Sequence, residues 1–165
     1  KECLEEVKIA SHRANVLEEN RLHKIGGFLV YPFDVVHDVK CFGFVISHPE
    51  MGTTMFVTDT MYVPNRVKGL NNVIIEANYC ENIIEEKTDK PFLIDRVKKS
   101  HLSIQNCIKC LQANDLSNVN NIVLIHLSNT NSDAARFKRD VEKATGKKVT
   151  IADKGTEIDF NKNPF

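Results

Sequence analysis

The sequence predicts an α/β sandwich, and three observations support this prediction. The first half has short β-type segments separated by turn residues, and the second half alternates apolar strands with amphipathic helices. The length of 165 residues suits one compact domain or most of one, so we treat residues 1–165 as a single, partial domain. In such folds the loops at the sheet edges carry the functional side chains.

Short apolar runs rich in β-branched and aromatic residues mark the predicted strands. They cover residues 28–36, 41–47, 53–58, 72–76 and 121–127, with shorter strands at 149–152 and 157–160. Gly26-Gly27 precedes the first strand, and Met51-Gly52 forms a hairpin turn between the second and third. Residues 1–20 are expected to form a short helix or a connecting segment.

Two amphipathic helices are predicted in the second half of the chain, where the spacing of the apolar residues changes to that of a helix. The first has apolar residues at i, i+3, i+4 and i+7, namely Ile104, Cys107, Ile108 and Leu111, and Ser103 is its expected N-cap. The second spans residues 132–144, and its predicted buried residues are Ala134, Phe137, Val141 and Ala144. Gly146 stands where a C-terminal cap glycine belongs.

Composition excludes several classes of protein. Lys plus Arg equals Asp plus Glu at 22 each, so bulk charge gives no general attraction to nucleic acid. No apolar run reaches the ~18 residues that span a bilayer, and no signal-peptide pattern opens the chain. We therefore expect a cytoplasmic protein without a membrane partner. Composition and pattern fix no oligomeric state.

The five cysteines are an odd number, which favours free thiols over a disulfide framework. Cys107 and Cys110 form a C-x-x-C pair inside the predicted amphipathic helix, whereas a redox pair should open a helix after a strand. We interpret them as core thiols.

Three metal-competent residues stand where apolar strands end. His37 follows FDVV, Asp59 follows MFVT, and His126 follows IVLI. Strand ends are rigid, and imidazole and carboxylate groups bind zinc and also suit iron or manganese. Each residue alone is more typical of a turn or a cap, and for the three positions together a shared site and separate structural roles both stay open.

The segments FDVVHDVKCFGFVI, MFVTDT and IVLIHLSNTNS resemble the later motifs of the metallo-β-lactamase superfamily. They are most similar to the branch that contains the tRNA 3′-processing endonuclease RNase Z and related bacterial and phage hydrolases. In that branch a histidine precedes a Gly-aromatic strand, an aspartate lies in a Thr-Asp-Thr motif, and a histidine ends a strand in His-x-Ser. The resemblance covers residues 25–160 and implies the C-terminal portion of an αβ/βα sandwich whose first half is incomplete.

The resemblance also implies roles for single residues. His37 would bind one metal, Asp59 would bridge two, and His126 would bind the second. His101 would be a general acid for the leaving oxygen, so that Asp59 and His101 carry catalysis. The implied cofactor is a pair of zinc ions, with manganese or iron as alternatives, and the implied substrate is a phosphodiester or a nucleic acid. Asp38 is either a partner of His37 or a solvated turn residue.

One departure from the superfamily affects the expected activity. The His-x-His-x-Asp-His motif, which supplies further metal ligands, is absent from the chain and would precede Lys1. We therefore expect a fragment that binds metal weakly and catalyses little by itself. Two alternatives stay open: a hydrolase of small esters, thioesters or lactones, and a degenerate binding domain without activity.

Basic residues precede His101, and they have two interpretations. Arg96, Lys98 and Lys99 could meet a phosphate, or they could form a solvated helix face.

Overall fold

The computed structural model describes residues 15–86 and 91–163 and contains one mixed sheet with four helices among them. The sheet has seven strands in sequential order. The strands are β1 (His23–Ile25), β2 (Phe28–Asp34), β3 (Phe42–His48), β4 (Gly52–Val57), β5 (Leu70–Glu76), β6 (Asn121–Ile125) and β7 (Val149–Ile151). The helices are α2 (Glu81–Glu85), α3 (Pro91–Ser100), α4 (Ile104–Ala113) and α5 (Ala134–Thr145).

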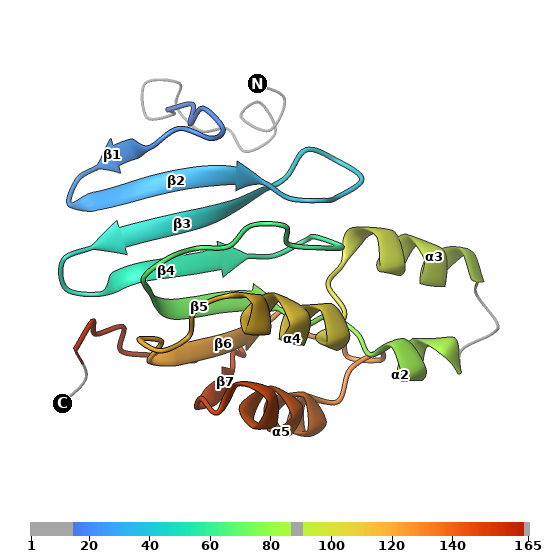
Figure 1. Cartoon of the computed structure of the whole chain (residues 1–165). Coiled ribbons are helices and arrows are strands. Elements are labelled where there is room, and N and C mark those ends of the chain that lie inside the picture. The colour runs from blue at the N-terminus through green and yellow to red at the C-terminus, as the bar shows by residue number, and fades with distance from the viewer. Residues whose placement is uncertain (1–14, 87–90, 164–165) are drawn as a thin grey trace.

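The sheet changes character at β4. Strands β1 to β4 are antiparallel neighbours, whereas β4 to β7 are parallel. Because β2, β4, β5 and β6 run in one direction, their C-terminal ends share one edge of the sheet (Figure 1). Helix α3 lies beyond this edge in the same view.

The main core lies between the sheet and two helices. Helices α4 and α5 pack side by side and direct Cys107, Leu111, Phe137 and Val141 into this core. The side chain of Ser103 accepts a hydrogen bond from the Asn106 N–H, which caps α4 as predicted. Gly146 ends α5 with a left-handed conformation at φ 66°, also as predicted.

The opposite face of the sheet carries a row of apolar side chains. Phe44, Phe56, Ile74 and Val123 are register partners on successive strands, and the two phenylalanine rings lie 6.5 Å apart. None of the four belongs to the main core cluster. The described residues therefore supply one sheet of a sandwich and the helices that cover one of its faces.

The predicted strands at 28–36, 41–47, 53–58, 72–76, 121–127 and 149–152 are confirmed within a few residues at their ends. The predicted strand at 157–160 is wrong, because that segment has no ladder partner. Its carbonyl groups bind side-chain amides instead: Asn121 Nδ2 donates to Asp159 O at 3.3 Å. Strand β1 and helices α2 and α3 were not predicted from the sequence. The helix or connecting segment expected at residues 1–20 falls largely outside the described residues.

Cys107 and Cys110 are buried in α4, and they are free, like Cys41 and Cys80. Burial raises the pKa of the Cys110 thiol to about 11. Core thiols are thus confirmed for the C-x-x-C pair, and Cys3 lies outside the described residues.

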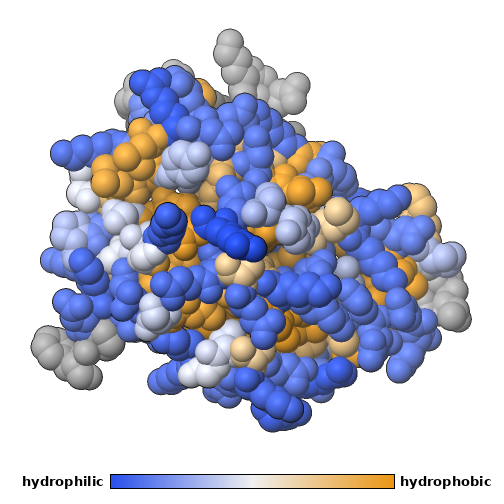
Figure 2. Space-filling view, viewed as in Figure 1, coloured by the Kyte–Doolittle hydropathy of each residue, from blue (hydrophilic) through white to orange (hydrophobic). Residues whose placement is uncertain are grey.

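Hydrophilic residues predominate on the face shown in Figure 2, and hydrophobic ones form separate patches there. Among the described residues no helix combines the length and the apolar character that a membrane crossing demands.

Candidate metal centre

Three side chains reach the candidate site from the C-terminal ends of neighbouring parallel strands. Glu76 is the last residue of β5, Asp59 follows β4, and His126 follows β6. Asp59 and His126 have positive φ angles of 52° and 57°, a conformation that is uncommon for residues other than glycine. Such backbone strain at two strand ends is typical of functional sites.

His101 joins them from another part of the chain. It follows α3, where its N–H donates to the Val97 carbonyl at 2.9 Å. The donor atoms of Asp59, Glu76, His101 and His126 all lie within 4.8 Å of one another. Asp59 Oδ1 is 3.4 Å from His126 Nδ1 and 3.6 Å from His101 Nδ1.

The carboxylate of Glu76 contacts the imidazoles of both His101 and His126. Its Oε1 atom lies 2.8 Å from the Nδ1 atoms of both His101 and His126. Of these two contacts, the one to His101 is a hydrogen bond, in which the Glu76 carboxylate accepts from the imidazole. The Nδ1 atom of His126 also lies 3.4 Å from the Thr58 hydroxyl oxygen.

The other oxygen of Glu76 is bound by the backbone. Oε2 accepts from the N–H groups of Thr60 at 3.3 Å and Leu102 at 3.2 Å. The residue is 0% exposed, whereas the side chain of His126 is 45% exposed and that of Asp59 34%. A buried carboxylate with three hydrogen-bond donors, and with the His126 ring 2.8 Å away, is a rigid anchor for the two rings.

The hydrogen bond to Glu76 raises the pKa of the His101 imidazole above its ordinary value of about 6.5. Burial of the ring acts in the opposite direction, and the charges of Glu76, Asp59 and Asp38 add to the rise. His101 therefore stays protonated at higher pH than an isolated histidine does.

His37 lies beside this group rather than within it. It stands in the loop between β2 and β3, and its ring centroid is 6.2 Å from that of His101. Its Nε2 atom contacts Asp38 Oδ1 at 3.3 Å, while its buried Nδ1 atom has no hydrogen-bond partner in the part of the chain that the structure describes. A buried ring nitrogen without a partner is costly unless another ligand satisfies it.

The donor set suits a divalent metal. Two imidazoles and two carboxylates are ligands of zinc, iron and manganese, and their spacing fits one ion. The orphaned nitrogen of His37 offers one further donor next to the group. On the chemistry of its residues, this edge of the sheet fits a metal.

Of the residues predicted from sequence, the structure brings together Asp59, His101 and His126, and places His37 at their margin. Asp38 contacts His37, as expected for a partner of that ring. Glu76 was missed, because it looked like the polar end of an ordinary buried strand. A useful signal was available: Glu76 ends a continuously apolar run, as His126 does.

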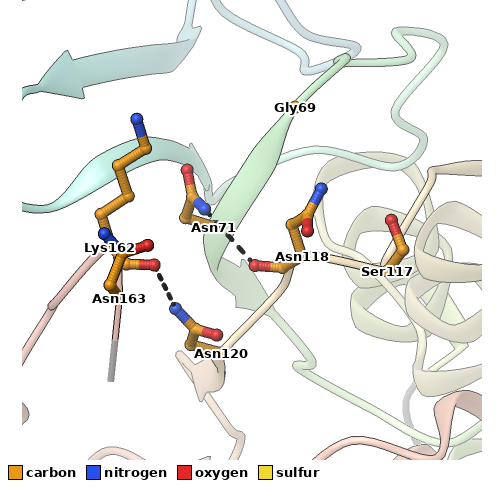
Figure 3. Close-up of a pocket in the computed structure, with 7 residues that line it drawn as sticks. All are labelled: Gly69, Asn71, Ser117, Asn118, Asn120, Lys162 and Asn163. Carbon is orange, nitrogen blue, oxygen red and sulfur yellow. Dashed lines mark hydrogen bonds between the residues drawn. The ribbon is translucent and has the colours of Figure 1, made fainter. Parts of the chain in front are cut away.

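A separate pocket lies at the other end of the same strands. It is lined by Gly69, Asn71, Ser117, Asn118, Asn120, Lys162 and Asn163 (Figure 3). The amide of Asn71 donates to Asn118 O at 3.4 Å, and that of Asn120 donates to Lys162 O at 3.1 Å. The Asn71 amide thus ties β5 to the loop before β6, and the Asn120 amide ties the C-terminal segment to the sheet, so we assign the pocket a structural role.

No protein-family model matches the sequence, and a search of the curated proteins finds no match either. Solved structures do match the shape, and they show that the chain has a metallo-β-lactamase fold. At these low identities the likeness concerns the fold alone.

The similar structures include the metallo-β-lactamase fold protein YhfI from Bacillus subtilis, with a TM-score of 0.68 and 15% identity over 94% of this chain and 59% of that one. An isothiocyanate hydrolase from Delia radicum gut bacteria has a TM-score of 0.61 and 17% identity over 89% of this chain and 60% of that one. CmlA, a diiron β-hydroxylase from Streptomyces venezuelae, has a TM-score of 0.52 and 11% identity over 81% of this chain and 32% of that one. The chain thus spans about three-fifths of the length of the first two proteins.

Proposed function

We propose that this chain carries part of the active site of a metal-dependent hydrolase that cleaves phosphodiesters. The observation that carries the proposal is the Glu76 carboxylate, which is fully buried and holds two imidazoles at 2.8 Å beside a half-exposed Asp59. Structural ion pairs seldom place two histidines on one buried oxygen. The arrangement is typical of a site in which ring orientation matters.

The residues divide the work between metal binding and proton transfer. His37, Asp59 and His126 would hold a divalent ion, with zinc as the first expectation. When bound, such an ion lowers the pKa of a coordinated water towards ~7 and stabilises developing negative charge. Glu76 lies 2.8 Å from His126 Nδ1 and would help to orient this ring as a ligand.

His101 supplies the proton that a phosphodiester needs. Cleavage of a P–O bond leaves an alkoxide, a poor leaving group that departs more easily when an acid protonates it. The hydrogen bond to Glu76 raises the pKa of His101, so its imidazole stays protonated at higher pH than an isolated histidine does, and Glu76 holds the ring in place. The proposed acid, His101, and the metal ligand His126 thus both contact Glu76.

Two alanine variants test this division. His126→Ala should weaken zinc binding at least tenfold, because it removes a ligand, whereas His101→Ala should leave zinc affinity within about threefold. Competition with a chromophoric chelator measures both. Equal losses of zinc affinity in the two variants would show that His101 is a metal ligand. The proposed role of His101 as the general acid would then be wrong.

The second candidate is hydrolysis of a small ester. Exposed apolar residues beside the site, Val39 and Leu93, favour a small organic substrate over a purely polar one. Ester cleavage does not need the proton from His101, since its leaving group departs from a tetrahedral intermediate. Turnover of p-nitrophenyl acetate that survives His101→Ala, with no turnover of bis(p-nitrophenyl) phosphate, would favour this candidate.

A further inference from the structure

We infer that a cavity between His37, His101 and helix α3 binds an apolar group that carries an anion, and that Arg96 recognises this anion. The inference rests on the proposed function, because it assigns the cavity to the substrate of the same site. It narrows the substrate to a small phosphodiester that carries an apolar group with a negative charge away from the bond that breaks.

The cavity adjoins the candidate metal centre. It has a volume of about 480 Å³, within the range of small-molecule sites. Two of its walls are the rings of His37 and His101, and α3 supplies Leu93, Arg96 and Val97. A molecule in the cavity would therefore touch both imidazoles.

Arg96 supplies the guanidinium group of this cavity, and no carboxylate among residues 15–86 and 91–163 pairs with it. It forms no ion pair with any described residue, whereas Lys98 on the same helix binds Glu85 at 3.0 Å. The carboxylate of the cavity, Asp38, is engaged by His37 at 3.3 Å. An unpaired guanidinium in a cavity can bind a carboxylate or a phosphate with two parallel hydrogen bonds.

Apolar side chains line the cavity around Arg96. Val39 is 64% exposed and Leu93 51% exposed, and Val97 completes this part of the wall. Leaving such residues open to water is unfavourable, and covering them with an aromatic or aliphatic group recovers that free energy. A polynucleotide would present sugars and phosphates here, and an apolar anion fits the lining better.

Two probes of equal shape test the inference on the metal-free chain. The probes are 2-naphthoate, which is charged, and 2-naphthalenemethanol, which is neutral. NMR titration of the methyl groups of Val39, Leu93 and Val97 measures the affinity of each. The chain should bind naphthoate about tenfold more tightly than the alcohol.

Matched variants separate recognition by Arg96 from general charge. Arg96→Ala should weaken naphthoate binding about tenfold and leave the alcohol unchanged. Lys99→Ala removes an exposed cation that does not line the cavity, and it should change neither affinity. Leu93→Ser should weaken both probes. All three residues are exposed on α3, so the variants should keep the fold, which the amide spectrum checks.

Several results would overturn the inference. Equal affinity for the two probes in the unchanged chain is one, and equal losses in Arg96→Ala and Lys99→Ala is another. Shifts centred on another surface would also overturn it. Because metal is absent, the outcome does not depend on hydrolysis: if naphthoate binds as expected while His126→Ala leaves zinc binding unchanged, only the proposed function fails.

Discussion

At the scale of single residues, Glu76 holds the imidazole groups of the candidate metal centre in place. Its carboxylate has no exposure to water, and its two oxygens are used by two rings and two backbone N–H groups. Sequence could supply Asp59, His101 and His126, because each lies in a motif. It could not supply Glu76, since one glutamate at the end of an apolar strand acquires its meaning only from the groups that surround it.

The pKa of His101 tests this role of Glu76. In the unchanged chain the pKa of His101 should lie above 6.5, and in Glu76→Gln it should fall, because the charged acceptor is lost. NMR titration of the imidazole measures both values. If the pKa of His101 does not change in Glu76→Gln, Glu76 does not control the protonation of His101.

The same shift sets a dependence of stability on pH. Since the folded protein binds the proton of His101 more tightly than the unfolded chain does, this contribution is fully present below about pH 6.5. It is lost as the pH rises through the raised pKa. Metal binding has the opposite trend, because its imidazole ligands must be deprotonated, so metal affinity should increase as the pH rises.

At the scale of elements, helix ends and tight contacts follow local rules that the sequence displays. Ser103 and Gly146 were predicted as caps and occupy those positions. The N-cap of α5 is Asp133, one residue after the predicted start at 132, and its carboxylate accepts from Arg136 N at 2.9 Å. Helix α3 was missed because its apolar residues Phe92 and Leu93 face water instead of a core.

The cap of α5 provides a prediction of stability. Asp133→Ala should lower the free energy of unfolding by about 1 kcal/mol, because it removes the acceptor for a helix N–H. Asp133→Asn retains an acceptor oxygen and should cost little. Urea denaturation followed by circular dichroism compares them, and equal losses in both variants would show that the cap hydrogen bond is not the cause.

A close contact between Gly43 and Phe33 inside the sheet provides a second prediction of stability. A Cβ atom at Gly43 would lie 2.5 Å from the ring of Phe33, which is 1% exposed. Gly43→Ala should therefore destabilise the fold by about 1–3 kcal/mol through overpacking. Adding Phe33→Leu should cost less than the sum of the two single changes, because the smaller side chain relieves the contact. Strict additivity in this cycle would contradict the explanation.

At the scale of the whole molecule, the parallel strands explain how distant residues meet. Asp59, Glu76 and His126 are far apart along the chain, yet each stands at the C-terminal end of a neighbouring strand. The alternation of strands and helices predicted this common edge. The strand at 157–160 could not be judged from sequence, since the side-chain amide of Asn121 binds the carbonyl group of Asp159 in place of a strand partner.

The most direct test of the account asks whether this edge of the sheet binds a metal. Mn²⁺ added to the isotope-labelled chain should broaden the NMR signals of Asp59, Glu76, His101 and His126 before any others, even if affinity is weak. Asp59→Asn should abolish this selective broadening, and Asp159→Asn, a change in an exposed carboxylate elsewhere, should leave it intact. Broadening that persists in Asp59→Asn, or that is centred away from these four residues, would contradict the account.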